Sequence, residues 1–332
     1  MLQSKPSATN ESLALQRRLR GEKIFSLYRK YGIVLVFLLI FVLSALCSPN
    51  FLKVQNLVNI VRQNATITIL ACGMNILIIS GFIDLSGGLV LAMSGCFAAG
   101  VMAATQSLPL AILTGLGTAM LANYVSGFLI TKFNLPAFIA TLAMTNIANG
   151  VMQVYTHGSA ITGVGILSFM GQGYIGPVPF PIVLMLAMVA MTWVLLKKTK
   201  FGLYVYSIGG NKQATVASGI NVNRMIRLFY TFHGAMVGLA GIVLMGRLNS
   251  GQPSVGTGYE FDAITAVVVG GTSFTGGIGS VFGTLVGSLI VGMINNVLVL
   301  LNVSTQYQLI VKGLLIAGAV TLDLKTRERS KV

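Results

Sequence analysis

The chain has little charge, and negative charge is scarcest. Only 9% of the 332 residues are charged, and 7 Asp and Glu stand against 22 Lys and Arg. About a quarter of a soluble globular domain is charged. Together with a hydrophobic fraction of 55%, this scarcity excludes an ordinary soluble domain and indicates a membrane protein.

Cysteine and histidine are also scarce. The three cysteines lie in or beside apolar segments with no CxxC spacing, and the two histidines, His157 and His233, are far apart in sequence. This pattern offers no disulfide framework, no metal-ligand set and no catalytic constellation, so we expect the cysteines to be small packing residues and no metal to bind. The phosphate-loop pattern GxxxxGK[ST] is absent as well. If ATP drives this protein, we expect another chain to bind it.

The positive charge gathers in three segments. Residues 1–30, the segment 197–227 and the tail 323–332 hold most of the Lys and Arg. Basic segments of this kind lie on the cytoplasmic side of a membrane and face anionic lipid, so we expect both termini there and no nucleic-acid partner. Because the first apolar run begins only after residue 29, it is expected to be a retained anchor rather than a cleavable signal.

Long apolar runs predict an all-α, polytopic membrane protein with about ten transmembrane helices, since one span needs about 20 apolar residues. The transmembrane domain is expected over 31–322, with 197–227 as a cytoplasmic loop inside it. The predicted spans are 31–47, 65–81, 88–105, 108–131, 136–155, 180–196, 228–248, 261–271, 280–301 and 307–322. Residues 51–63 are amphipathic and expected at the interface. No basic residue lies between Arg62 and Lys132, so nine or eleven spans remain possible.

Two glycine-rich breaks give this core its broken, short helices. The first break contains Ser80-Gly81 and then Gly87-Gly88. The second contains Gly270-Gly271 and then Gly276-Gly277, which resembles the first, and each break follows an apolar run. Transporters are often built from internal repeats with interrupted helices. With 39 glycines in the chain, coincidence is the alternative.

The few carboxylates near apolar runs are candidates for function, because charge is costly there. Asp84 is expected to cap the following helix, to line a pathway, or both. Glu260 and Asp262 would lie about 200° apart on a helix and make a poor acid–base pair. We expect cap and structural roles for them, with gating second; one of them is expected to face a partner or Arg247. Lys312, inside the last span, could pair or reach the interface.

The loop 197–227 contains a short helix with its own caps. Asn211 is a good N-cap, Lys212–Ser218 can form two turns, and Gly219 is a good C-cap. A capped helix in a cytoplasmic loop suits docking to a soluble partner, and an ordinary surface helix is the alternative.

These segments together resemble the permease subunits of bacterial ATP-binding-cassette importers for monosaccharides, in the group that includes branched-chain amino-acid permeases, and among them the ribose permeases most closely. The resemblance covers the chain from Ser48 to Asp323, and Phe82 and Gly87 depart from the usual Gly and Val. The segments that carry it are Ile83–Ser86, Pro136–Leu142, Gly209–Asn211, Ser218–Asn223, Gln252–Pro253, Gly256–Ile264, Gly270–Ser273 and Tyr307–Lys312.

The resemblance implies a transport subunit of the bacterial inner membrane, not an enzyme, which imports a monosaccharide, with ribose as the expected sugar. It implies pairing with a second permease subunit as a homodimer, and no cofactor on this chain, with ATP and Mg on a separate cytoplasmic ATPase. It also implies a periplasmic or lipid-anchored sugar-binding protein outside.

Residue by residue, the expected sites fall into three groups. The ATPase-coupling loop is Gly210, Asn211, Lys212, Ala214, Ser218 and Gly219. The external face and gate are Gln252, Tyr259, Glu260 and Asp262. Because neutral sugars need amides and hydroxyls, the candidate pathway is Asn75, Asp84, Ser86, Asn146 and Asn295.

Three alternatives stay open. The same machine could carry another sugar, a furanose signal molecule or a branched-chain amino acid. An ion-driven secondary transporter would need several intramembrane acidic or His residues, and the chain has few. An integral-membrane enzyme would need clustered His, Asp or Ser near one interface, which the sequence does not show.

Overall fold

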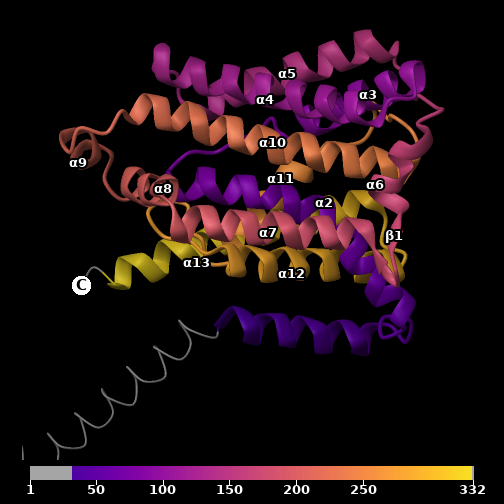
Figure 1. The fold of residues 1–332 in the computed structure, drawn as a ribbon. Coiled ribbons are helices and arrows are strands. Elements are labelled where there is room, and N and C mark those ends of the chain that lie inside the picture. Colours follow the sequence, from indigo (N-terminus) through magenta and orange to yellow (C-terminus); the bar gives the residue numbers. More distant parts are fainter. Residues whose placement is uncertain (1–31, 331–332) are drawn as a thin grey trace, which may run out of the picture.

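The computed structural model describes residues 32–330, which form a bundle of helices (Figure 1). The basic segment 1–30 and the last two residues lie outside the described part. The first described helix is Gly32–Cys47. It is followed by α2 (Val54–Ile79), α3 (Gly87–Thr105), α4 (Leu108–Lys132), α5 (Ala137–Thr156), α7 (Phe180–Lys198), α8 (Lys200–Gly210), α9 (Lys212–Ala217), α10 (Val222–Leu248), α11 (Tyr259–Val269), α12 (Val281–Leu300) and α13 (Thr305–Ser330).

The connection between α5 and α7 has small elements of its own. It contains η1 (Gly165–Ser168), α6 (Phe169–Gln172) and a two-stranded antiparallel hairpin of β1 (Tyr174–Ile175) and β2 (Val178–Pro179).

Every predicted span is helical, and six described helices are long and apolar enough to cross a membrane: α3, α4, α5, α7, α10 and α12. This confirms an α-helical, polytopic membrane protein. In Figure 1 the long helices run side by side, with α8 and α9 at one end of the bundle and α6 and β1 at the other.

Two predicted boundaries are wrong. The segment 51–63 is not a separate interfacial helix, because α2 begins at Val54 and runs unbroken to Ile79. Part of its apolar face, Phe51, Leu57 and Ile60, packs in a cluster with α12 and the first helix, while Leu52 and Val54 are exposed. Likewise, α10 begins at Val222 rather than Leu228, because the Asn221 side chain accepts a hydrogen bond from the Arg224 backbone and starts the helix early.

Burial separates central from peripheral helices. In α10, 78% of the most apolar stretch is buried, against 28% in α4 and α5 and 22% in α7. Glycines allow this packing, since a Cβ at Gly234 or Gly238 would press on the α4 backbone. We therefore assign α10 to the centre of the bundle, with α4, α5 and α7 presenting apolar faces suited to lipid.

The two glycine-rich breaks end their helices in one way. At the end of α2, Gly81 has φ +82°, its N–H donates to Ile78 O, and the Phe82 N–H donates to Leu77 O. At the end of α11, Gly271 has φ +83° and the same two bonds run to Val268 and Val267. Both are the αL termination that glycine favours. The shared geometry is what the predicted repeat requires at these two points.

Candidate functional site

The two breaks meet each other and the loop helix α8. The Gly277 N–H donates to Ile79 O across 2.8 Å, which joins the second break to the end of α2. Gly209, near the end of α8, sits so close that an added Cβ would overlap Ile79 O and lie 2.6 Å from Gly277 N. Only a residue without a side chain fits between these two backbones. This three-way contact, of Ile79–Phe82, Gly276–Gly279 and Gly209, is named here the hinge contact.

A tyrosine side chain strengthens the hinge contact. Tyr206 of α8 donates its hydroxyl to Gly279 O at 2.9 Å. Burial raises the pKa of the Tyr206 hydroxyl, so the group stays protonated and remains a donor. The loop helix is thereby bonded to the break that precedes α12.

The short helix α9 has the caps that the sequence predicts. Asn211 Oδ1 accepts from the Ala214 N–H at 2.9 Å, and Gly219 has φ +82° just after the helix. The Lys212 ammonium lies 5.9 Å from the centre of the Phe82 ring, at the first break. All six residues predicted for the coupling loop are exposed: Gly210, Asn211, Lys212, Ala214, Ser218 and Gly219. The short helix α9 is therefore open on its outer side, and Lys212 at its start lies against Phe82 of the first break.

Asp84 is fully buried in the connection from α2 to α3. Its Oδ1 accepts from the Ser86 N–H at 2.7 Å and from the Ser86 hydroxyl at 2.6 Å, and its Oδ2 lies 3.0 Å from Nε2 of His233. The expected helix cap is replaced by a tight turn, because the N–H that Asp84 binds precedes the first helical residue, Gly87. In this conformation neither Asp84 nor Ser86 faces an open passage.

His233 is a site residue that sequence reasoning missed. It is fully buried on α10, 149 positions from Asp84. The neighbouring glycines make room for its ring, since a Cβ at Gly73 would lie 2.5 Å from Nδ1. The available signal in the sequence was one histidine in an apolar segment and one carboxylate in another. This signal does not identify the two residues as partners.

The helices α10 and α5 also hold the same connection through its backbone. Tyr230 of α10 donates to Ile83 O at 2.8 Å, and Thr145 of α5 donates to Leu85 O at 3.0 Å. The connection is therefore fixed on both sides of Asp84, and buried polar groups of its backbone are paired.

Glu260 and Asp262 take different roles at the start of α11. Glu260 is buried, accepts from the Gly258 N–H at 3.1 Å, and lies against Gly88, where a Cβ would overlap its carboxylate. Asp262 pairs with Lys312 of α13 at 2.8 Å. The partner of Asp262 is thus Lys312 and not Arg247, because this part of α11 packs on α13.

Arg247 instead binds neutral oxygens. It donates to Gln63 O at 3.3 Å and to the Tyr259 hydroxyl at 3.4 Å. With Asn59, Arg62 and Gln63 it lines a pocket of about 340 Å³, which the sequence did not indicate. Gln252, which the sequence predicts for the external face, is half-buried, and its side-chain amide donates to the Ser250 hydroxyl at 3.0 Å.

The remaining pathway candidates are not brought into one cavity. Asn75 is buried on α2 and accepts from the Thr272 hydroxyl at 2.8 Å, so it ties α2 to the second break. Asn146 is exposed on α5 and donates to Leu142 O of its own helix. Asn295 on α12 is half-buried and lies beside Asp262. Among the described side chains there is also no group of three His, Cys, Asp or Glu that could hold a metal.

Comparison with known proteins agrees with these features. Residues 56–320 match the family described as the permease component of the branched-chain amino acid transport system. The ribose import permease protein RbsC of Bacillus subtilis is 44% identical over 87% of this chain and 91% of its own length. RbsC of Escherichia coli K12 is 41% identical over 92% and 97%, and the L-arabinose transport system permease protein AraH of that strain is 36% identical over 90% and 91%. No solved structure matches the chain significantly.

The apolar helices, the interrupted spans and the capped loop helix define a membrane permease, which is a transport component rather than an enzyme. The chain belongs to the family of branched-chain amino acid transport system permease components. It is an integral protein of the inner membrane.

Proposed function

We propose that the chain is the membrane subunit of an ATP-binding-cassette importer and that its cargo is ribose. The relatives with 44% and 41% identity are named ribose import permeases. The relative named for L-arabinose is less similar, at 36%. The cytoplasmic ATPase, the external sugar-binding protein and a second permease copy are parts of this proposal.

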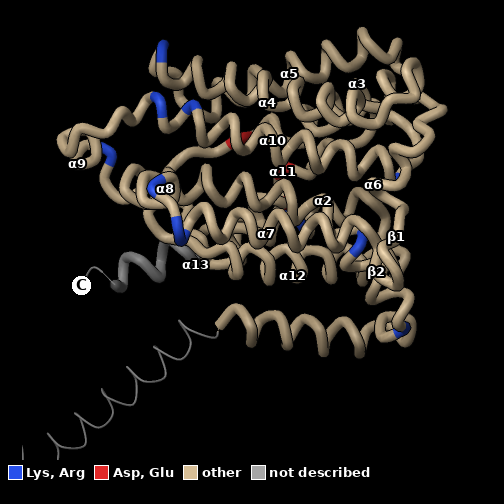
Figure 2. Tube along the Cα trace, viewed as in Figure 1, with Lys and Arg blue, Asp and Glu red and all other residues tan. Residues whose placement is uncertain are grey.

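The orientation in this proposal follows from charge. Lys and Arg gather at the end of the bundle that holds α8 and α9 (Figure 2). Positive residues favour the cytoplasmic side, so we place α9 and the chain termini there, with about ten spans and the Arg62–Arg247 pocket outside.

The hinge contact carries the proposal. An ATPase seated on the exposed side of α9 would move α8, which packs at Gly209 against both breaks and is bonded through Tyr206 to the second. The breaks end α2 and α11 and lead into α3 and α12, so movement at α9 reaches four central helices. ATP binding and hydrolysis could then bias two states of the bundle.

Uptake into proteoliposomes tests the function. The chain, the ATPase and the binding protein encoded with it are reconstituted, and radiolabelled ribose is offered outside with ATP inside. We expect uptake that needs ATP and the binding protein, with unlabelled L-arabinose competing less well than ribose. Uptake driven by an ion gradient without ATP would overturn the class, and preference for another cargo would overturn only ribose.

A further inference from the structure

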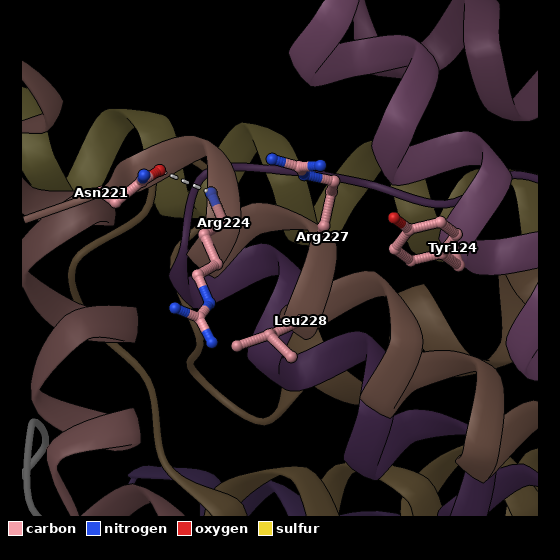
Figure 3. A pocket seen from close by; sticks show the side chains of 5 residues that line it. All are labelled: Tyr124, Asn221, Arg224, Arg227 and Leu228. Atoms are coloured by element: carbon pink, nitrogen blue, oxygen red, sulfur yellow. Dashed lines mark hydrogen bonds between the residues drawn. The ribbon is translucent and has the colours of Figure 1, made fainter.

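A second pocket opens at the Lys/Arg-rich end of the bundle. It lies between α4 and the start of α10, has a volume of about 340 Å³, and is lined by Tyr124, Asn221, Arg224, Arg227 and Leu228 (Figure 3). The polar groups of this pocket are mainly hydrogen-bond donors. The Asn221 Oδ1 is already occupied by the Arg224 N–H at 3.0 Å, which leaves the amide NH₂ as its available donor.

The two arginines have no carboxylate partner among the described side chains. The carboxylates whose side chains the structure describes are Asp84, Glu260 and Asp262, and they are buried and bonded to His233, Gly258 and Lys312 respectively; the side chains of Asp323 and Glu328 lie outside the described ones. Arg227 binds one backbone oxygen, Asn223 O, through Nε at 3.3 Å. Both arginines therefore keep donors for an external anion.

The helix itself does not favour the charge of Arg224. The first turn of a helix carries partial positive charge, so Arg224 in the first turn of α10 opposes the helix dipole. An anion placed here gains from the dipole, and because the two guanidinium groups point in different directions in Figure 3, both reach it through rotation of their side chains.

Apolar surface continues from the pocket onto the outside of the bundle. Leu121 and Tyr124 are one turn apart on α4, with exposed fractions of 64% and 42%, and Leu228 is 43% exposed. A small soluble anion would leave this apolar surface uncovered, whereas a phospholipid would place its phosphate in the pocket and its acyl chains along α4. Tyrosine is also favoured at the level of lipid headgroups.

We propose that this pocket binds the headgroup phosphate of an anionic phospholipid, held by Arg224, Arg227, Asn221 and Tyr124, with the acyl chains against Leu121 and Leu228. The site contains none of the candidate pathway residues and does not depend on which sugar is carried. It uses the chemistry by which basic pockets between membrane helices take anionic headgroups.

Native mass spectrometry of the full chain tests the site. Purified protein is titrated with phosphatidylglycerol, or with phosphatidylcholine as the uncharged comparison. We expect Arg224→Gln/Arg227→Gln to weaken the tightest phosphatidylglycerol binding at least about tenfold more than Lys198→Gln/Lys200→Gln does. The control removes the same charge from exposed residues at the same end of the bundle. Equal binding in the two double variants would overturn the proposal.

Two further arms separate the lipid from other anions. Leu121→Ala/Leu228→Ala should weaken phosphatidylglycerol binding and leave the effect of inorganic phosphate on thermal unfolding unchanged. If inorganic phosphate competes at the same site and the leucine variant binds lipid normally, the ligand is a free anion and the proposal fails. It also fails if the arginine variant keeps its lipid but loses the ATPase, because the pocket is then a protein contact. Thermal unfolding without added lipid reports whether each variant is folded.

Discussion

The two breaks in the core end their helices alike and are held differently afterwards. After Gly81 the chain enters a connection fixed by a buried carboxylate and by side chains of α5 and α10. After Gly271 it enters a connection without Asp or Glu, which bonds to the end of α2 and to α8. The first break is anchored to α5 and α10, whereas the second is anchored to α2 through Asn75 and Ile79 and to the loop helix α8 through Tyr206.

This difference suggests a division of work. A connection tied by Asp84 to His233 resists displacement, because separating buried polar partners is costly. The second connection bonds to α2 at Thr272 and Gly277. Further along it, the Gly279 carbonyl accepts the Tyr206 hydroxyl, so the Gly279 end is the part that can follow α8 when it moves. In the proposed importer the first break would act as the fixed side and the second as the moving side.

The largest expected effect is at the fixed side. Asp84→Ala removes the acceptor of Ser86 and the partner of His233, and we expect it to lower stability by about 3–5 kcal/mol. Asp84→Asn keeps an oxygen for the Ser86 N–H and should cost less. Thermal unfolding in detergent measures both. An Asp84→Ala protein that melts like the parent would remove the distinction between the breaks.

Adjacent glycines allow a sharper test at the hinge contact. Gly209→Ala places a methyl group against Ile79 O and Gly277 N, and overpacking of this kind costs about 1–3 kcal/mol. Gly210→Ala is the matched control, because a Cβ there has no atom within 4 Å. We expect Gly209→Ala to lower the melting temperature and to reduce ribose uptake per ATP hydrolysed, and Gly210→Ala to melt like the parent, because only the first methyl group meets other atoms. Equal behaviour of the two would mean that α8 is not coupled to the breaks at this point.

The smallest expected effect concerns a single hydroxyl. Tyr206→Phe removes the hydrogen bond to Gly279 O, worth about 1 kcal/mol, and leaves the ring in place. Tyr204→Phe, on the same helix, serves as the control. We expect Tyr206→Phe to lower uptake per ATP while melting changes little. A change in melting alone would assign Tyr206 to stability and not to coupling.

Much of the fold was predictable because its signals are local. Apolar runs locate each span, and side-chain caps such as Asn211 are decided within a few residues. The continuity of the segment 51–63 with α2 was not predicted, because an amphipathic face has the same sequence pattern whether it meets lipid or another helix. Its actual partners on α12 lie more than 200 positions away in the sequence.

The site was less predictable because it depends on distant pairs. Asp84 with His233, and Asp262 with Lys312, are separated by 149 and 50 positions. Sequence reasoning found three of these four residues as candidates and paired none correctly. Gly209 shows the same limit, since its importance comes from two backbones that approach it in space.

The cysteines give this chain an internal reporter of its topology. Cys72 and Cys96 are buried, whereas Cys47 is exposed where the first described helix ends. A thiol reagent that cannot cross membranes would therefore be expected to modify one position from one side only. Labelling of intact cells, compared with inverted vesicles, would read which face of the membrane Cys47 occupies without any engineered tag.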